Sequence, residues 1–151
     1  MFIRKLNNNR FQIRLVKKEE VMKSLYEFAK QYNHLLGFAE FKMKGSVEDI
    51  EYAFSLGYGQ EKNGYKIMKY QDKAELLVAL GDISWDNEDT NKPIVHCHAV
   101  FAKNDGMGTA FGGHLKEATV NLTTLIIIDI LSNEKVVCKL DKEMNIKLWD
   151  F

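Results

Sequence analysis

The sequence predicts an α+β domain in which a mostly antiparallel sheet packs against one main helix. Three observations support this prediction: an alternating segment near the N-terminus, a single stretch of helical periodicity, and a long series of strand-like segments after it. The composition is that of a globular chain, since 46% of the 151 residues are hydrophobic and 28% are charged. No repeat, linker or low-complexity stretch interrupts it, so we expect residues 1–151 to form one domain.

The first part of the chain predicts one strand followed by the helix. Apolar residues occupy every second position of Arg10–Val16, which is the period of a strand with one buried face. From Glu19 the apolar positions change to helical spacing. Glu19 and Glu20 would lie in the first turn, where the helix dipole favours acidic groups. We expect this helix to end near Asn33.

The remaining chain predicts strands separated by turns. These segments share short apolar or alternating patterns bounded by glycine, asparagine or aspartate. The segment Leu125–Ile128 has no polar alternation, so we expect both of its faces to be covered, with a second subunit as a source of the second cover. The predicted strands lie at Phe38, Ile50–Phe54, Tyr65–Met68, Leu76–Leu80, Ile94–Phe101, Val120–Ile130, Val136–Leu140 and Ile146–Trp149.

Charge and composition argue against several classes of protein. The 21 basic and 21 acidic residues cancel, which removes the main driving force for binding a phosphate backbone. Met1–Lys5 lacks the apolar core of a signal peptide, and the longest apolar run, Leu125–Ile128, is too short to span a bilayer. The chain has two cysteines and enough apolar residues to build a core without a disulfide. We therefore expect a cytoplasmic protein with free thiols and no membrane partner.

Three of the four histidines predict a metal site. His96 and His98 are two residues apart in a predicted strand, so both rings project from the same face. His114 follows a Gly-Gly pair, where a backbone without Cβ atoms can turn and approach a neighbouring strand. The turn at 104–108 lets the chain double back and bring His114 beside the other two. Three imidazoles with one open position are the ligand set of a catalytic zinc site, so the expected cofactor is a divalent metal, zinc first.

An alternative reading makes the three histidines unrelated polar residues on a solvated sheet face, as is common for a lone His-x-His pair. A third histidine that a hairpin can bring beside this pair favours the metal-site hypothesis. Cys97 points away from His96 and His98 in the pleat and is expected to be a buried structural thiol. His34 is expected to cap the helix or lie on the surface.

Carboxylates near the histidines are candidates to support the metal ligands. Glu117, three residues after His114, is the candidate to hydrogen-bond a metal-bound histidine. A group of acids near Trp85 could also supply a carboxylate, although a solvated loop explains them equally well. That group comprises Asp82, Asp86, Glu88 and Asp89.

The motifs Val95-His96-Cys97-His98-Ala99 and Gly112-Gly113-His114-Leu115, with Leu80-Gly81-Asp82-Ile83-Ser84, resemble those of the plants-and-prokaryotes-conserved (PPC) domain family. The resemblance runs over nearly the whole chain. It implies a homotrimer with a fold similar to that of acetolactate decarboxylase, and a metal held by His96, His98 and His114. In plants the domain accompanies an AT-hook in nuclear DNA-binding proteins, and this chain has no such hook.

Three functions follow as hypotheses, and no catalytic acid or base can be named from the sequence. The first is a metal-dependent lyase or hydrolase acting on a small oxygen-rich molecule, with zinc activating water or polarising a carbonyl. The second is a non-enzymatic trimeric scaffold, in which the metal stabilises a contact or binds a small ligand. The third is a DNA-associated regulator, which the family label suggests and the balanced charge disfavours. A concave pocket beside the histidines would favour the first.

Overall fold

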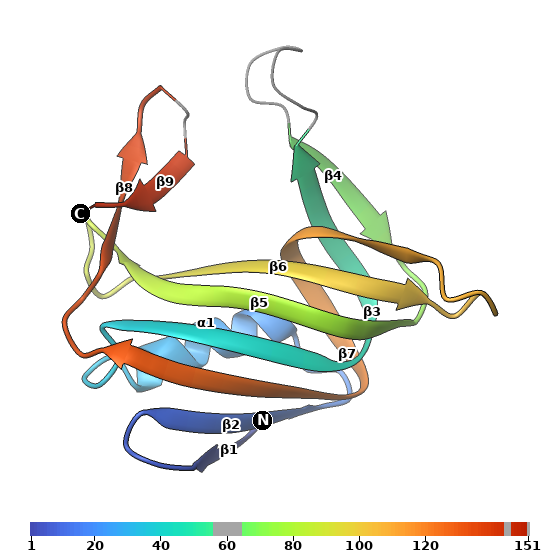
Figure 1. Ribbon diagram of the computed structural model, residues 1–151, viewed down its shortest axis with the longest axis horizontal. Coiled ribbons are helices and arrows are strands. Elements are labelled where there is room, and N and C mark those ends of the chain that lie inside the picture. The colour runs from blue at the N-terminus through green and yellow to red at the C-terminus, as the bar shows by residue number, and fades with distance from the viewer. Residues whose placement is uncertain (56–64, 144–145, 151) are drawn as a thin grey trace.

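A computed structural model describes residues 1–55, 65–143 and 146–150 (Figure 1). Within these ranges the strands belong to one nine-stranded sheet, antiparallel except for a short parallel contact between β5 and β8. The prediction of a mostly antiparallel sheet with one main helix is confirmed. The elements are β1 (Phe2–Lys5), β2 (Arg10–Val16), α1 (Val21–Gln31), β3 (Phe38–Ser55), β4 (Tyr65–Tyr70), β5 (Ala74–Asp86), β6 (Pro93–Lys103), β7 (Ala110–Ser132), β8 (Val137–Asp141) and β9 (Ile146–Trp149).

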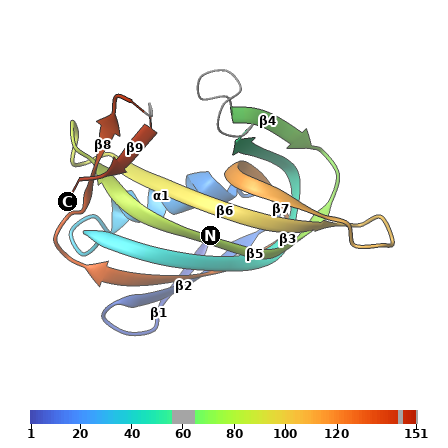
Figure 2. The ribbon, with the colours of Figure 1, turned by 45° about the horizontal axis from the view of Figure 1, so that its top comes forward.

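Helix α1 is shorter than the sequence predicted. The two acidic residues expected in its first turn precede it, because Glu20 is the extended N-cap residue and forms an isolated bridge with Thr119 of β7. The C-cap is Tyr32, so the helix ends just before the predicted boundary. The apolar stripe of α1, which includes Leu25 and Phe28, is fully buried against the sheet (Figures 1 and 2). The helix α1 is not long and apolar enough to cross a membrane, and it is the one helix in the described ranges.

Strands β3 to β7 are longer than the sequence predicted. Phe38 and Ile50–Phe54 belong to the same strand, β3, and the register of β3 against β7 shifts at several β-bulges. Bulges let a long strand bend, and the local sequence carries no strong signal for them. The first strand, β1, was not predicted, because its four residues are too short for a clear alternation. Its pairing with β2 forms a small hairpin at the sheet edge.

Strands β3, β5, β6 and β7 form a closed ring of pairings, since β6 pairs with both β5 and β7 while β3 also pairs with both. Strand β7 makes this possible because its first part pairs with β6 and its last part with β2 (Figure 2). Ile126 and Ile128 of β7 are buried in the core, whereas Leu125 and Ile127 are only half-buried. A single chain therefore covers one face of this apolar segment fully and the other in part.

The β8–β9 hairpin rises from one end of the sheet, beside the end of β5 (Figures 1 and 2). Trp85 anchors this region, since its buried ring donates a hydrogen bond from Nε1 to the carbonyl of Leu36 at 2.9 Å. Asp86 is also buried, and its carboxylate accepts a hydrogen bond from the Lys147 ammonium of β9. The hairpin is thereby tied to the strand that leads into the histidine-bearing region.

Candidate metal centre

The strand register brings the three histidines onto one face of the sheet. In the β6–β7 ladder, His98 lies directly opposite His114. His96 is two residues from His98 along β6, so its ring projects to the same side. Their neighbours Cys97 and Ala99 point into the core and are buried. The sequence prediction that these imidazoles share one face agrees with this placement.

The glycine pair before His114 allows the close approach of three strands. A Cβ atom on Gly112 would lie 2.1 Å from the carbonyl oxygen of Ala99 in β6. A Cβ atom on Gly113 would lie 2.5 Å from the carbonyl oxygen of Ala53 in β3, and Gly113 also has a positive φ of 154°. No larger residue fits these positions without moving backbone, so the pair sets the position of His114.

The three rings form a nearly equilateral triangle. Ring centroids of His96 lie 5.0 Å from those of His98 and His114, and the His98–His114 separation is 5.4 Å. Each ring offers a nitrogen such that all three nitrogens lie within 4.8 Å of one another. Three nitrogens on one zinc ion, at about 2.1 Å from it, would be roughly 3.4 Å apart. Small side-chain rotations would close the difference, so the residues present fit a metal ion.

The protonation of the rings also suits metal binding, since a ligand imidazole must be neutral. Burial, together with the charges of Lys116 and the two other histidines, lowers the pKa of His114 to about 4. Burial, with a contribution from His96, also lowers the pKa of His98 from its ordinary value. Both residues therefore carry a free nitrogen lone pair at neutral pH.

Asp82 supports the site from β5. It pairs with His96 in the β5–β6 ladder, and its Oδ2 lies 3.2 Å from Nδ1 of His96. A carboxylate that accepts a hydrogen bond from Nδ1 leaves Nε2 of the same ring as the ligand atom and holds the ring in place. In the sequence, Asp82 was one of several acidic residues whose positions a solvated loop explained as well as a role at the histidines did.

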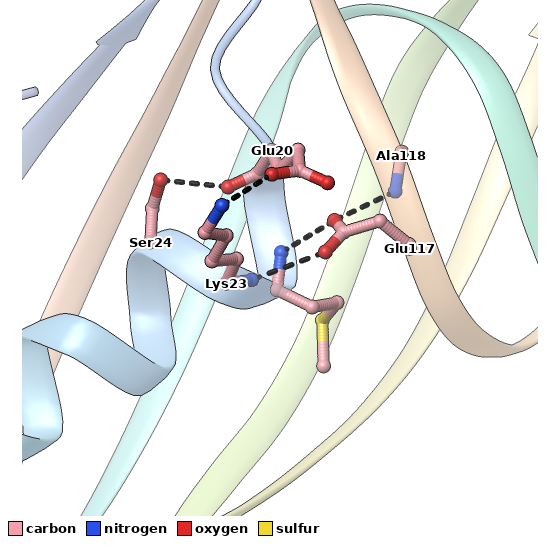
Figure 3. Close-up of polar contacts among 6 residues, drawn as sticks. Glu20, Lys23, Ser24, Glu117 and Ala118 are labelled. Carbon is pink, nitrogen blue, oxygen red and sulfur yellow. Dashed lines mark hydrogen bonds and ion pairs between the residues drawn. The ribbon is translucent and has the colours of Figure 1, made fainter.

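The structure does not bring Glu117 to the histidines. Its carboxylate instead accepts hydrogen bonds from the backbone N–H groups of Met22 at 2.8 Å and Lys23 at 3.2 Å, at the N-terminus of α1 (Figure 3). It also accepts one from the N–H of Ala118 at 2.9 Å. Residues three apart in a strand project to opposite faces, which explains why spacing from His114 was a poor guide. Glu117 therefore stabilises the helix start rather than the metal site.

A pocket of about 710 Å³ opens beside two of the histidines. One wall is the sheet, with Asp82, His96, His114 and Lys116, and another is the β8–β9 hairpin. Lys116 was missed in the sequence, although its place two residues after His114 could have put it on the same strand face. The remaining lining residues are Ser84, Ile94, Val95, Cys138, Ile146, Lys147, Leu148 and Trp149.

The other residues singled out in the sequence lie away from metal chemistry. Cys97 is fully buried, and burial raises the pKa of its thiol to about 12, so it is a core residue as predicted. Cys138 is also buried and shares a hydrogen bond with Ser84, and neither cysteine forms a disulfide within the described residues. His34 is exposed in the turn after α1.

Comparison with solved structures shows the same fold in other proteins. One match is a Bacteroides thetaiotaomicron protein that is named as a candidate DNA-binding protein. It has a TM-score of 0.86 at 19% identity, over 99% of this chain and 96% of that chain. The metal-containing protein AF0104 of Archaeoglobus fulgidus matches with a TM-score of 0.77 at 24% identity, over 94% and 93%. Acetolactate decarboxylase from Bacillus subtilis subspecies spizizenii matches with a TM-score of 0.56 at 11% identity, over 78% of this chain and 51% of that chain, which confirms the predicted similarity of fold.

Sequence comparison identifies the family. Among curated protein sequences, no significant relative of this chain was found. The family model of the Plants and Prokaryotes Conserved (PCC) domain matches residues 4–132, a range that includes all three clustered histidines and most of the sheet. The resemblance inferred from the His-x-His and Gly-Gly-His motifs is thereby confirmed, and the chain belongs to the Plants and Prokaryotes Conserved domain family.

Proposed function

We propose that this protein is a metal-dependent enzyme that binds zinc through His96, His98 and His114 and acts on a small oxygen-rich molecule in the adjoining pocket. The single observation that carries this proposal is the position of His96 and His114 in the pocket wall. Three protein ligands leave a coordination position for water or substrate, and a purely structural zinc site has four. The metal-containing relative from Archaeoglobus fulgidus supports the same assignment.

The chain's own residues would prepare the site for Lewis-acid chemistry. A bound zinc ion would supply polarisation of a carbonyl or a lowered pKa of water, as in lyases and hydrolases. Asp82 holds the ring of His96 through Nδ1. The apolar side chains of Ile94, Ile146 and Leu148 line the pocket and give it an apolar wall for the non-reacting part of a substrate.

Metal analysis tests this proposal. Purified protein should contain about one zinc per chain, and His98→Ala should lose it because two imidazoles bind zinc far more weakly than three. His34→Ala is the matched control, since this histidine is exposed outside the cluster. Equal metal content in His98→Ala and in the unchanged protein would refute the site.

We further propose that the protein is a homotrimer that uses the histidine-bearing face of the sheet for subunit contacts. On this face Val78, Leu80 and Val100 surround His98 in the ladder and are 44%, 61% and 42% exposed. Clustered exposed apolar side chains are typical of protein contact surfaces. Size-exclusion chromatography with light scattering would give three times the 17.4 kDa chain mass for a trimer, and a monomer mass at micromolar concentration would refute it.

The alternative of DNA association comes from the name of the Bacteroides relative. The equal numbers of basic and acidic residues disfavour it, because duplex binding depends on neutralising phosphates. Retardation of duplex DNA at low salt and micromolar protein would revive this alternative, and absence of retardation would remove it.

A further inference from the structure

The pocket contains a cation that no acidic group of the described residues neutralises. Two lysines line it, Lys116 on β7 and Lys147 on β9. Lys147 donates a hydrogen bond to the buried carboxylate of Asp86, which also lies 3.6 Å from the ammonium of Lys92, so Lys147 already has an acidic partner. Lys116 is exposed and has no ion pair within residues 1–55, 65–143 and 146–150. The charge of Lys116 is therefore available to a ligand.

The strand register places this charge next to the histidines. His98 lies opposite His114 in the β6–β7 ladder, and the paired part of the ladder ends there. Two further steps along both strands would set His96 opposite Lys116, on the same face as the imidazoles. Lys116 lies two residues after His114 on β7 and lines the same pocket. The lysine and two metal ligands thus share one wall of the pocket.

The rest of the lining selects the kind of molecule that fits. Asp82 is the one carboxylate among the described lining residues, and its Oδ2 is engaged by His96. Lys116 forms no ion pair with Asp82 among the described residues, so its ammonium can pair with an anionic group of a ligand. The hairpin wall is largely apolar, with Ile146, Leu148 and Trp149. Such a pocket favours a ligand with one charged end and an apolar body over a fully hydrated inorganic anion.

We propose that Lys116 binds the carboxylate of a small organic acid whose apolar body packs against the β8–β9 hairpin. Any reaction of this ligand rests on the metal site proposed above, whereas the binding of its carboxylate by Lys116 does not depend on the metal. It narrows the substrate class from oxygen-rich molecules in general to carboxylic acids with an aliphatic or aromatic part. An ammonium–carboxylate contact is a charge-assisted hydrogen bond, and its loss typically weakens binding about tenfold or more.

Calorimetric titration of the metal-loaded full chain tests the proposal. The probes are 4-methylpentanoate, its neutral isostere 4-methylpentanamide, and inorganic phosphate. We expect the acid to bind at least about tenfold more tightly than either of the other two. Lys116→Met should weaken binding of the acid about tenfold and leave binding of the amide unchanged. Lys139→Met is the matched control, because this exposed lysine lies on β8 and does not line the pocket.

Two controls separate this inference from the proposed function. Zinc content is measured in each variant before titration, and Lys116→Met should retain the metal because Lys116 is not a ligand. The titrations are repeated after chelation, where the difference between acid and amide should persist in a weaker form. Absence of zinc from the unchanged protein would refute the metal site alone. Equal binding of the acid to Lys116→Met and to the unchanged protein, or no preference for the acid over phosphate, would overturn the assignment of Lys116.

Discussion

Replacement of Asp82 by asparagine should weaken metal binding through His96. The carboxylate of Asp82 lies 3.2 Å from Nδ1 of His96 and is the group that orients this ring among the described residues. Loss of such a partner typically costs 10–100-fold in metal affinity, or about 1.4–2.7 kcal/mol. The His96 side chain is 47% exposed, so solvent screens the interaction and the lower end of the range applies. We expect Asp82→Asn to bind zinc about tenfold more weakly.

A competition titration against a chromophoric zinc chelator measures this affinity directly. Glu88→Gln is the control, because it removes the same charge from an exposed position just beyond β5. Melting curves of the metal-free proteins show whether each variant remains folded. If Asp82→Asn and Asp82→Ala both bind zinc as tightly as the unchanged protein, Asp82 has no part in orienting His96.

Three other perturbations have expected outcomes. Glu117→Ala should lower the free energy of unfolding by about 2 kcal/mol, because it removes the acceptor for two N–H groups at the start of α1, and urea denaturation with Glu20→Gln as control measures this. In metal-free folded protein the pKa of His114 is about 4, whereas its ordinary value, which applies to the unfolded chain, is 6.5. Between pH 4 and pH 6.5 the unfolded chain therefore binds more protons at His114 than the folded protein does. Stability should therefore fall as pH drops from 6.5 towards 4, and a pH series of melting temperatures should show a smaller fall for His114→Gln. Leu80→Asp should reduce the mass measured by light scattering, because it charges the most exposed apolar side chain beside His98, and an unchanged mass would place the subunit contact elsewhere.

The sequence alone predicted the clustering of His96, His98 and His114 because its signals are local. Two histidines with a spacing of two must share a strand face, and a glycine pair before the third permits close strand packing. Strand β2 was predicted with its observed limits for the same reason, since its alternation reflects one buried face. The family resemblance depended on the same short motifs and matches residues 4–132.

Tertiary structure alone decided which groups surround the histidines. Asp82 is fourteen residues from His96 and reaches it only through the β5–β6 register, while Glu117 is three residues from His114 and yet lies at the start of α1. The pocket likewise depends on the β8–β9 hairpin, whose place beside β5 follows from long-range contacts. Side-chain periodicity specifies the face of a strand, but the neighbours of that face depend on pairing register and bulges, which are set by the packing of the whole sheet.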